Sequence, residues 1–253
     1  MRAPEAHNCG CFPTGHHYPG IADYIVRTPE GIVGLAKGVA PETPWAAAPF
    51  CVIDFETTGR DANSDRIIEV GIVCFEHGQC IERYECLVNP GIPVPEEARA
   101  IHGITDEELA NAPSFDSVFD QLVPKLQGRL AVAYNAPFDR GFLHAETRRL
   151  SRTLLPDCPA LDDNVVWIDP LVWARELFKY EKGKKLTDMC QRLNITLDRA
   201  HRACGDAEAA GMVLLAIAAK LPVRYDDLIR LQSQYADRQE ADFAAWRSRR
   251  GLT

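Results

Sequence analysis

The chain has 253 residues, of which 46% are hydrophobic and 25% are charged, as is usual for a globular protein of one large domain. Its 28 lysines and arginines stand against 36 aspartates and glutamates, so the net charge is −8, which excludes a protein that coats duplex nucleic acid by neutralising phosphates. The nine cysteines are scattered and odd in number, and the N-terminus lacks the apolar core of a signal peptide, so a reducing cytoplasm is the expected location. The longest apolar run, 209–219, is too short to cross a bilayer, and no membrane partner is expected.

Residues 1–47 are expected to form a separate N-terminal arm, because they are rich in proline and glycine and run into a proline-rich linker at 41–49. Two β-prone segments, 24–26 and 32–35, flank a Thr-Pro-Glu-Gly turn and are compatible with a small hairpin. The arm also holds possible zinc ligands, but its Cys-x-Cys pair has no second pair at zinc-finger spacing, so a loosely ordered arm is favoured over a zinc site. These residues are His7, Cys9, Cys11, His16 and His17.

The main domain is expected to span residues 48–222, and its β-prone runs predict an α/β fold. The first three runs follow one another closely, with His77-Gly78 between the second and the third, and therefore predict an antiparallel meander. The last two alternate with helical segments, which predicts a mixed β-sheet flanked by helices. The five runs are 50–53, 66–75, 80–88, 130–133 and 165–168.

Helices are predicted where apolar residues recur at helical spacing after a capping residue. Thr105 and Glu108 form a capping-box pattern, Ser114 precedes an amphipathic run, and Pro137 stands at a helix start. The tail at 223–253 is expected to add one or two helices that cover an edge of the domain, a docking site for a partner being the alternative. The helices predicted for the main domain are 96–101, 105–110, 115–126, 137–150, 170–180, 186–193 and 203–220.

Two carboxylates, Asp54 and Glu56, stand at the C-terminal end of the first predicted strand. Because side chains alternate across a strand, residues two apart lie on the same face. Like charges this close repel each other unless a cation lies between them, and a hard divalent cation with oxygen ligands fits such a pair. An Asp-x-Glu pair alone is also compatible with a strand that ends in the solvated turn at 57–59.

Two further clusters, at 135–139 and 201–206, also stand at the ends of predicted elements. Asp139 lies in the first turn of the helix after the fourth strand, where the helix dipole favours an anion. Asp206 lies near the start of the last helix of the domain, and His201 precedes it on a loop. Taken singly, each acid is compatible with a residue that merely begins a helix.

Taken together, the three clusters resemble the three motifs of the DEDD superfamily of 3′→5′ exonucleases, in the branch with a histidine in the third motif. The sequences that carry the resemblance are DFETTG, AYNAPFDRGFL and HRACGDA, together with HGIT at 102–105. This branch includes the proofreading epsilon subunit of bacterial DNA polymerase III, RNase T and oligoribonuclease. The resemblance covers residues 49–220, and it implies a ribonuclease-H-like fold. Tyr134 departs from the pattern, because many relatives have histidine before the asparagine, but it is not at a metal-ligand position.

The resemblance implies hydrolysis of phosphodiester bonds assisted by two divalent cations, Mg²⁺ or Mn²⁺, about 3.5–4 Å apart. It implies that Asp54 bridges both cations, and that Glu56 and Asp206 complete the site that holds the attacking water. Asp139 would support the second cation, partly through water. His201 would be the general base, because imidazole ordinarily titrates near neutral pH and a loop position lets the ring move.

Substrate contacts are implied at five further positions. Thr57, Asn135 and Phe138 match residues that flank the terminal nucleotide in members of the family. Glu97 and His102 match positions that touch the terminal sugar and phosphate, although a surface acid and a turn histidine are the plain alternatives. A separate group of lysines precedes the helix at 186–193 and is compatible either with a solvated face or with a nucleic-acid contact. These are Lys179, Lys182, Lys184 and Lys185.

The sequence therefore predicts a metal-dependent 3′→5′ exonuclease that releases nucleoside 5′-monophosphates from DNA 3′ ends, in proofreading or repair. Single-stranded or frayed DNA is the expected substrate, because DFETTG and HGIT resemble the proofreading members. An RNA 3′-end-trimming exoribonuclease is one alternative. The other is a polymerase accessory subunit that acts mainly through binding, so a DNA polymerase is a possible partner.

Overall fold

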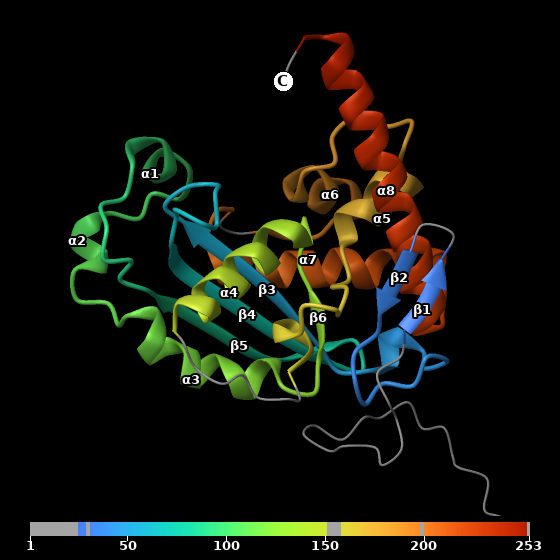
Figure 1. Cartoon of the computed structure of the whole chain (residues 1–253), viewed down its shortest axis with the longest axis horizontal. Helices are drawn as coiled ribbons and strands as arrows, with labels where there is room; N and C mark the ends of the chain where they lie inside the picture. The colour runs from blue at the N-terminus through green and yellow to red at the C-terminus, as the bar shows by residue number, and fades with distance from the viewer. Residues whose placement is uncertain (1–24, 29–30, 151–157, 198–199, 252–253) are drawn as a thin grey trace, which may run out of the picture.

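The computed structural model describes residues 25–28, 31–150, 158–197 and 200–251 (Figure 1). The possible zinc ligands all precede residue 25 and lie outside this described part. No helix within these ranges is long and apolar enough to cross a membrane.

The centre of the fold is a four-stranded sheet in the order β5-β4-β3-β6. The first three strands form the predicted antiparallel meander, and β6 lies parallel to β3. Strands β3 and β4 are almost entirely buried, whereas β5 at the edge alternates between exposed and half-buried residues. This mixed sheet flanked by helices confirms the predicted ribonuclease-H-like α/β fold. The strands are β3 (Phe50–Thr57), β4 (Ile67–Glu76), β5 (Gln79–Leu87) and β6 (Leu130–Val132).

The fifth predicted strand, 165–168, forms only isolated bridges: Ile168 pairs with Val132, and Val165 with Gly34. The extended stretch ends there because Asp169 accepts a hydrogen bond from the backbone N–H of Leu171 (2.8 Å) and begins a helix. The proline at position 170 has no N–H to continue a ladder.

The helices follow the predicted order with small changes at their ends. The predicted capping box is present, because the Glu108 N–H donates to Thr105 Oγ1 and the Thr105 N–H to Glu108 Oε2. Ser114 makes no side-chain capping bond, and the helix after Pro170 ends three residues earlier than predicted, at Leu177. The helices are α1 (Glu96–His102), α2 (Asp106–Leu109), α3 (Phe115–Leu126), α4 (Ala136–Arg149), α5 (Pro170–Leu177), α6 (Leu186–Leu193), α7 (Ala203–Ile217) and α8 (Tyr225–Arg249).

Helices cover both faces of the sheet, with α3 and α4 on one face and α7 on the other (Figure 1). The contact with α7 is unusually close. A Cβ on Gly71 of β4 would lie 2.2 Å from the backbone carbon of Ala203, and a Cβ on Gly211 of α7 would lie 2.5 Å from the Phe75 ring. Gly71, which pairs with Asp54, therefore lets the start of α7 approach the sheet beside the acidic motif of β3, and Gly211 lets the middle of α7 pack on Phe75.

The N-terminal region differs from the expected separate arm. Strands β1 (Ile25–Thr28) and β2 (Gly31–Gly34) form an antiparallel hairpin, and the chain then enters the main core. Leu35 and Trp45 are 2% and 1% exposed, and the Trp45 Nε1–H donates to the carbonyl of Pro222 (2.9 Å). The expected boundary at 47/48 thus falls after residues that belong to the core, because the apolar side chains among the prolines cover the face beneath α7 and α8.

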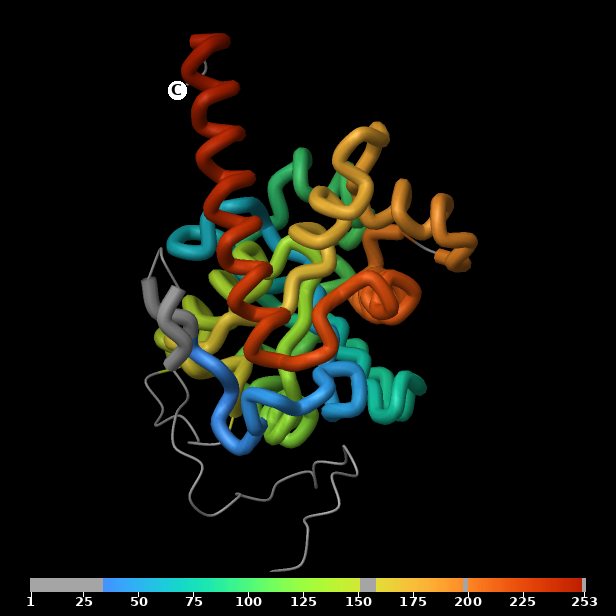
Figure 2. Tube along the Cα trace, turned by 90° about the vertical axis from the view of Figure 1, so that its right-hand side faces the viewer, coloured from blue at the N-terminus to red at the C-terminus, as the bar shows by residue number. Residues whose placement is uncertain are grey.

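The C-terminal tail is one helix, α8, whose two halves have different surroundings. Tyr225, Leu228 and Ile229 in its first half are buried, and Tyr235 packs edge-on against Trp173. The second half projects away from the rest of the molecule (Figure 2). The first half of α8 therefore packs into the main core of the domain.

Candidate active site

The end of β3 gathers the acidic residues that the sequence predicts as metal ligands. Asp54 and Glu56 extend from this strand, and burial together with the charges of Asp139, Asp206 and Glu56 raises the pKa of Asp54 well above its usual range. These electrostatic partners come from three separate elements, β3, α4 and α7. The structure thus brings together carboxylates that are up to about 150 positions apart in the chain.

Asp139 is held in place by the backbone of β3. Its side chain is buried at 3% exposure, and its Oδ1 accepts a hydrogen bond from the Phe55 N–H (3.0 Å). Pro137 in the first turn and the left-handed backbone of Asn135 (φ 75°) set where α4 begins. The bond to Phe55 therefore fixes the first turn of α4 beside the two carboxylates of β3.

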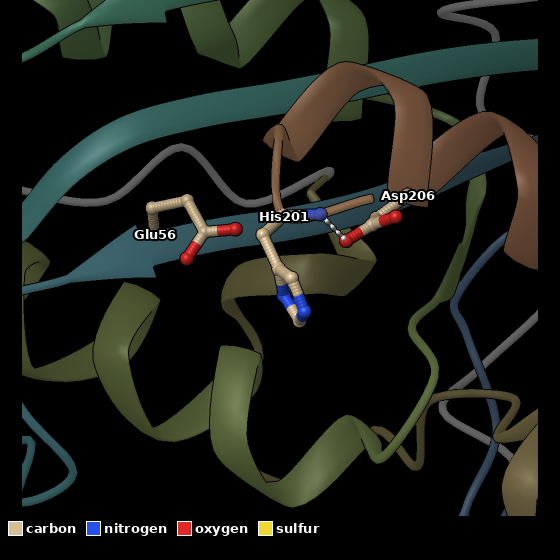
Figure 3. Close-up of side chains that lie close together, drawn as sticks. All are labelled: Glu56, His201 and Asp206. Carbon is tan, nitrogen blue, oxygen red and sulfur yellow. Dashed lines mark hydrogen bonds between the residues drawn. The ribbon is translucent and has the colours of Figure 1, made fainter. Parts of the chain in front are cut away.

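His201 and Asp206 come from the loop before α7 and from its first turn. The His201 N–H donates to Asp206 Oδ2 (2.9 Å), as Figure 3 shows, and His201 has a left-handed backbone (φ 63°). One ligand atom from each of Glu56, His201 and Asp206 lies within 4.8 Å of the other two. The predicted general base is exposed, so it lies at the open side of the cluster.

The residues fit a divalent cation. Burial raises the pKa of Glu56 to about 8, with contributions from Asp206 and Glu69, and burial also raises the pKa values of Asp139 and Asp206. Asp206 Oδ1 is buried without a hydrogen-bond partner in the described part of the chain. A cation would offset both the repulsion and the unpartnered oxygen, and a set made mostly of carboxylate oxygens suits Mg²⁺ or Mn²⁺.

A buried ion pair that the sequence analysis missed supports the start of α7. Glu69 of β4 is fully buried and accepts hydrogen bonds from Arg202 Nε (2.9 Å) and from the Ala203 N–H (2.9 Å). These bonds hold the backbone between His201 and Asp206 against the sheet. The sequence did carry a signal for this pair: Glu69 is the only charged residue within the apolar run IIEVGIVCF, and a buried acid needs a partner.

A second missed residue, Asp169, holds the start of α4. Its Oδ1 and Oδ2 accept hydrogen bonds from the backbone N–H groups of Asn135 and Ala136 (both 3.0 Å). The Asp169 N–H in turn donates to Gln232 Oε1 of α8 (2.8 Å). This buried network therefore links α8 to the turn that carries Asn135 and Asp139.

A pocket of about 880 Å³ lies beside the acidic cluster, and Glu56 forms part of its wall. All five side chains predicted to contact substrate line this pocket, namely Thr57, Glu97, His102, Asn135 and Phe138. His102 is buried, its Nδ1 accepts a hydrogen bond from the Ile104 N–H (3.0 Å), and its Nε2 has no partner in the described part of the chain. Burial lowers the pKa of His102. A largely apolar pocket that includes the rings of Phe55 and Phe138 and a few polar side chains thus adjoins the carboxylates.

A model of the RNase T family, described as an exonuclease, matches residues 51–214. The chain is 35% identical over 173 residues to the 3′-5′ exonuclease DinG of Bacillus subtilis, with 68% of this chain and 18% of DinG covered. It is 37% identical over 172 residues to the PolC-type DNA polymerase III of Bacillus cereus, with 67% of this chain and 11% of the polymerase covered. The chain therefore spans less than a fifth of the length of these relatives.

Solved structures share the fold. Exonuclease X in complex with 5′ overhanging duplex DNA superposes with a TM-score of 0.54 at 23% identity, covering 72% of this chain and 99% of that chain. The nuclease domain of 3′hExo, a DEDDh family member bound to rAMP, gives a TM-score of 0.56 at 20% identity, covering 69% and 93%. Escherichia coli Exonuclease I with a dA16 oligonucleotide gives 0.59 at 20% identity, covering 71% and 42%.

Proposed function

Because the chain belongs to the RNase T exonuclease family, we propose that it is a metal-dependent 3′→5′ exonuclease that releases nucleoside 5′-monophosphates from the 3′ ends of single-stranded or frayed DNA. One observation carries this proposal. Four carboxylates from three elements, two of them buried and two half-buried, meet beside an exposed histidine, next to a pocket large enough for a nucleotide. The family membership agrees with the resemblance inferred from the sequence motifs.

The proposed roles follow from where each side chain is held. Asp54, Glu56 and Asp206 are the ligands for divalent cations, and Asp139, fixed by the Phe55 N–H, supports them from α4. Divalent cations at such a cluster neutralise charge on the phosphate and promote ionisation of water. A ring nitrogen of His201 takes the proton from the attacking water, since this exposed ring lies beside Glu56 and Asp206.

The pocket receives the terminal nucleotide. The Phe138 ring, supported by Phe142 with ring centroids 4.9 Å apart, stacks on the last base. Thr57 and Asn135 flank the terminal nucleotide, and Asn135 is held in its left-handed conformation by Asp169. Glu97 and His102 contact the terminal sugar and its phosphate from the α1 side of the pocket.

DNA is the proposed substrate because the curated relatives include a DNA polymerase III of the PolC type and DinG. A DNA polymerase is accordingly the partner to test first. In PolC-type relatives the matching segment is part of the polymerase chain itself. The proposed partner of this chain is therefore a polymerase on a separate polypeptide.

The test is a side-by-side digestion of 5′-labelled single-stranded DNA and RNA of the same sequence. Each is offered with a free 3′ hydroxyl and with a nuclease-resistant phosphorothioate 3′ end, in Mg²⁺ and in excess EDTA. We expect stepwise shortening of the unprotected DNA in Mg²⁺ alone. Faster shortening of RNA would favour the 3′-end-trimming exoribonuclease instead. Shortening of neither substrate would contradict the proposed activity.

A further inference from the structure

The loop that joins α5 to α6, residues 178–185, is a concentrated basic feature of a chain with net charge −8. We call it the basic loop. Its lysines 179, 182 and 185 are exposed. Tyr180 is 91% exposed, and Lys179 Nζ lies 5.0 Å from the centre of the Tyr180 ring. An exposed aromatic ring beside several ammonium groups can bind a polyanion whose planar groups stack on the ring, as the bases of a nucleic acid do.

The conformation of the basic loop is fixed by Arg192 of α6. The Arg192 guanidinium donates to the carbonyls of Lys182 (2.8 Å) and Gly183 (3.1 Å) and pairs with Glu181 (2.7 Å). The left-handed backbone of Gly183 (φ 73°) completes the turn. The loop is therefore shaped by backbone contacts, which do not use the exposed ammonium groups of Lys179, Lys182 and Lys185.

These ammonium groups are not neutralised locally. Within the part of the chain that the structure describes, Lys182 and Lys185 form no ion pair, and Lys179 contacts only the Tyr180 ring among the interactions observed. Lysine side chains held at a fixed loop without acidic partners match the contacts that proteins make with phosphate backbones.

The basic loop is attached to the candidate active site. Tyr134 Oη donates to the carbonyl of Lys184 (2.5 Å), and Tyr134 immediately precedes Asn135, which lines the pocket. Figure 1 shows the loop projecting between α6 and α8 on the upper edge of the molecule, where the turn after β3 and α1 also lie. Tyr134 is also the position at which the sequence departs from the family pattern, and its bond to the loop gives the tyrosine a structural role here.

We propose that the basic loop binds the phosphate backbone of single-stranded DNA upstream of the nucleotide held in the pocket, with Tyr180 stacking on a base. This inference rests on the proposed function and adds a second binding site, for the part of the strand that lies outside the pocket. Lysine contacts with phosphates carry no sequence information, so the loop increases affinity for any long strand. A substrate of one nucleotide cannot reach it.

The test compares two substrates and two variants of matched charge. The loop variant is Lys179→Gln with Lys182→Gln and Lys185→Gln. The control variant is Lys37→Gln with Arg83→Gln and Arg148→Gln, which removes the same charge elsewhere on the surface. The substrates are a twenty-nucleotide oligo(dT) and the p-nitrophenyl ester of thymidine 5′-monophosphate, which occupies the pocket alone. Unchanged circular dichroism and unfolding temperature verify that both variants fold.

For the loop variant, we expect the ratio of kcat/KM on oligo(dT) to kcat/KM on the ester to fall about tenfold at low salt. The plot of log kcat/KM for oligo(dT) against log salt should become shallower by about 2, since each lost phosphate contact on a single strand contributes about 0.7. The control variant should keep both the ratio and the salt dependence. An unchanged ratio in the loop variant, or an equal fall in the control, would overturn the proposal.

Binding separates failure of this inference from failure of the proposed function. The affinity of labelled oligo(dT) for the 253-residue chain is measured by fluorescence anisotropy in the Asp54→Asn background, with and without the loop substitutions. If the parent chain hydrolyses neither substrate, the proposed function is wrong, and the anisotropy result alone decides the role of the loop. A loss of affinity of about tenfold supports the loop as a strand-binding site, and equal affinities refute it.

Discussion

The folded chain tolerates the negative charge of Asp54 poorly, because burial and repulsion by Asp139, Asp206 and Glu56 raise the pKa of its carboxyl group well above the usual range. Such a residue lowers stability in return for binding a cation, which is a common arrangement at functional sites. The same argument holds for Glu56, whose pKa is raised to about 8.

Replacing Asp54 by asparagine keeps the size of the side chain and removes one of the repelling charges. We expect Asp54→Asn to unfold at a higher temperature than the parent chain in EDTA, by about 2–4 °C for each kcal/mol gained in a domain of this size. Its nuclease activity should fall by several orders of magnitude. Thermal unfolding with EDTA and with Mg²⁺ measures the first effect, and Mg²⁺ should stabilise the parent more than the variant. Lower stability in EDTA or near-normal turnover would contradict this account.

His201 combines an unusual backbone with the proposed proton acceptor, and two substitutions separate these properties. Asparagine tolerates the left-handed conformation (φ 63°) better than alanine, and neither residue can act as a base near neutral pH. We expect both His201→Asn and His201→Ala to lower kcat roughly 10²–10⁴-fold while KM changes little. Normal kcat in the asparagine variant alone would assign the role of His201 to its backbone.

At the scale of elements, the Glu69–Arg202 pair fixes β4 to the start of α7 and so positions the third motif. We expect Glu69→Gln to reduce the free energy of unfolding by about 1–3 kcal/mol, because the buried bonds to Arg202 and to the Ala203 N–H weaken. Its kcat should fall on the order of 10²-fold, since His201 and Asp206 shift. Urea unfolding and steady-state rates measure both effects.

Glu85 provides the matched control for this pair. It also contacts Arg202 (2.8 Å), but from an exposed position on β5. Glu85→Gln should change the free energy of unfolding by no more than about 1 kcal/mol and should leave kcat intact. Equal effects of the two substitutions would show that Arg202 is merely a surface cation.

A helix or strand can be predicted from the sequence when residues close together in the chain determine it. The meander, the capping box at Thr105 and the helices of the main domain were predicted, because turn residues and apolar spacing act over a few positions. The prediction of a full strand at 165–168 was wrong, because the Asp169 side chain caps α5 and so ends the extended segment. The Glu69–Arg202 pair joins residues 133 positions apart, and no local pattern reports such a contact.

The candidate site was predicted differently, from motifs and not from folding rules. The structure gathers all four carboxylates at the end of β3 and all five substrate-contact residues around one pocket, but their chemical roles remain predictions. The residues that hold these side chains in place, Glu69 and Asp169, were not identified. Their function is to bind backbone N–H groups of distant segments, which only the folded chain brings near them.

For the molecule as a whole, residues 35–47 contribute to the domain core, so removal of residues 1–47 tests whether they are needed for folding. Removing residues 1–47 deletes Leu35 and Trp45 from the core, and loss of a buried tryptophan alone typically costs about 3–5 kcal/mol. We expect this truncation to unfold or to lose most of its stability. A chain that begins at residue 25 keeps every described element and is the control. A stable, active chain starting at residue 48 would restore the separate arm that the sequence predicted.

The net charge of −8 bears on which DNA ends the molecule can use. Drawing a paired terminal base into the pocket costs a few kcal/mol, and an acidic protein gains little general attraction to duplex DNA to offset this cost. Stacking of a freed base on Phe138 is worth about 1–3 kcal/mol. We therefore expect a mismatched 3′ terminus to be removed faster than a matched one without any polymerase present. Equal rates on blunt duplex and on single strands would instead indicate a duplex-binding surface.

The central claim is that the four carboxylates and His201 form one metal-dependent site that removes nucleotides from the 3′ end. The most direct measurement is the product pattern from a 5′-labelled DNA single strand incubated with the full chain and Mg²⁺, beside the Asp54→Asn variant. We expect a ladder of labelled strands shortened one nucleotide at a time, release of nucleoside 5′-monophosphates, and an intact strand with the variant or with EDTA. Internal cleavage, early release of the labelled 5′ nucleotide, or an undiminished ladder in the variant would contradict the central claim.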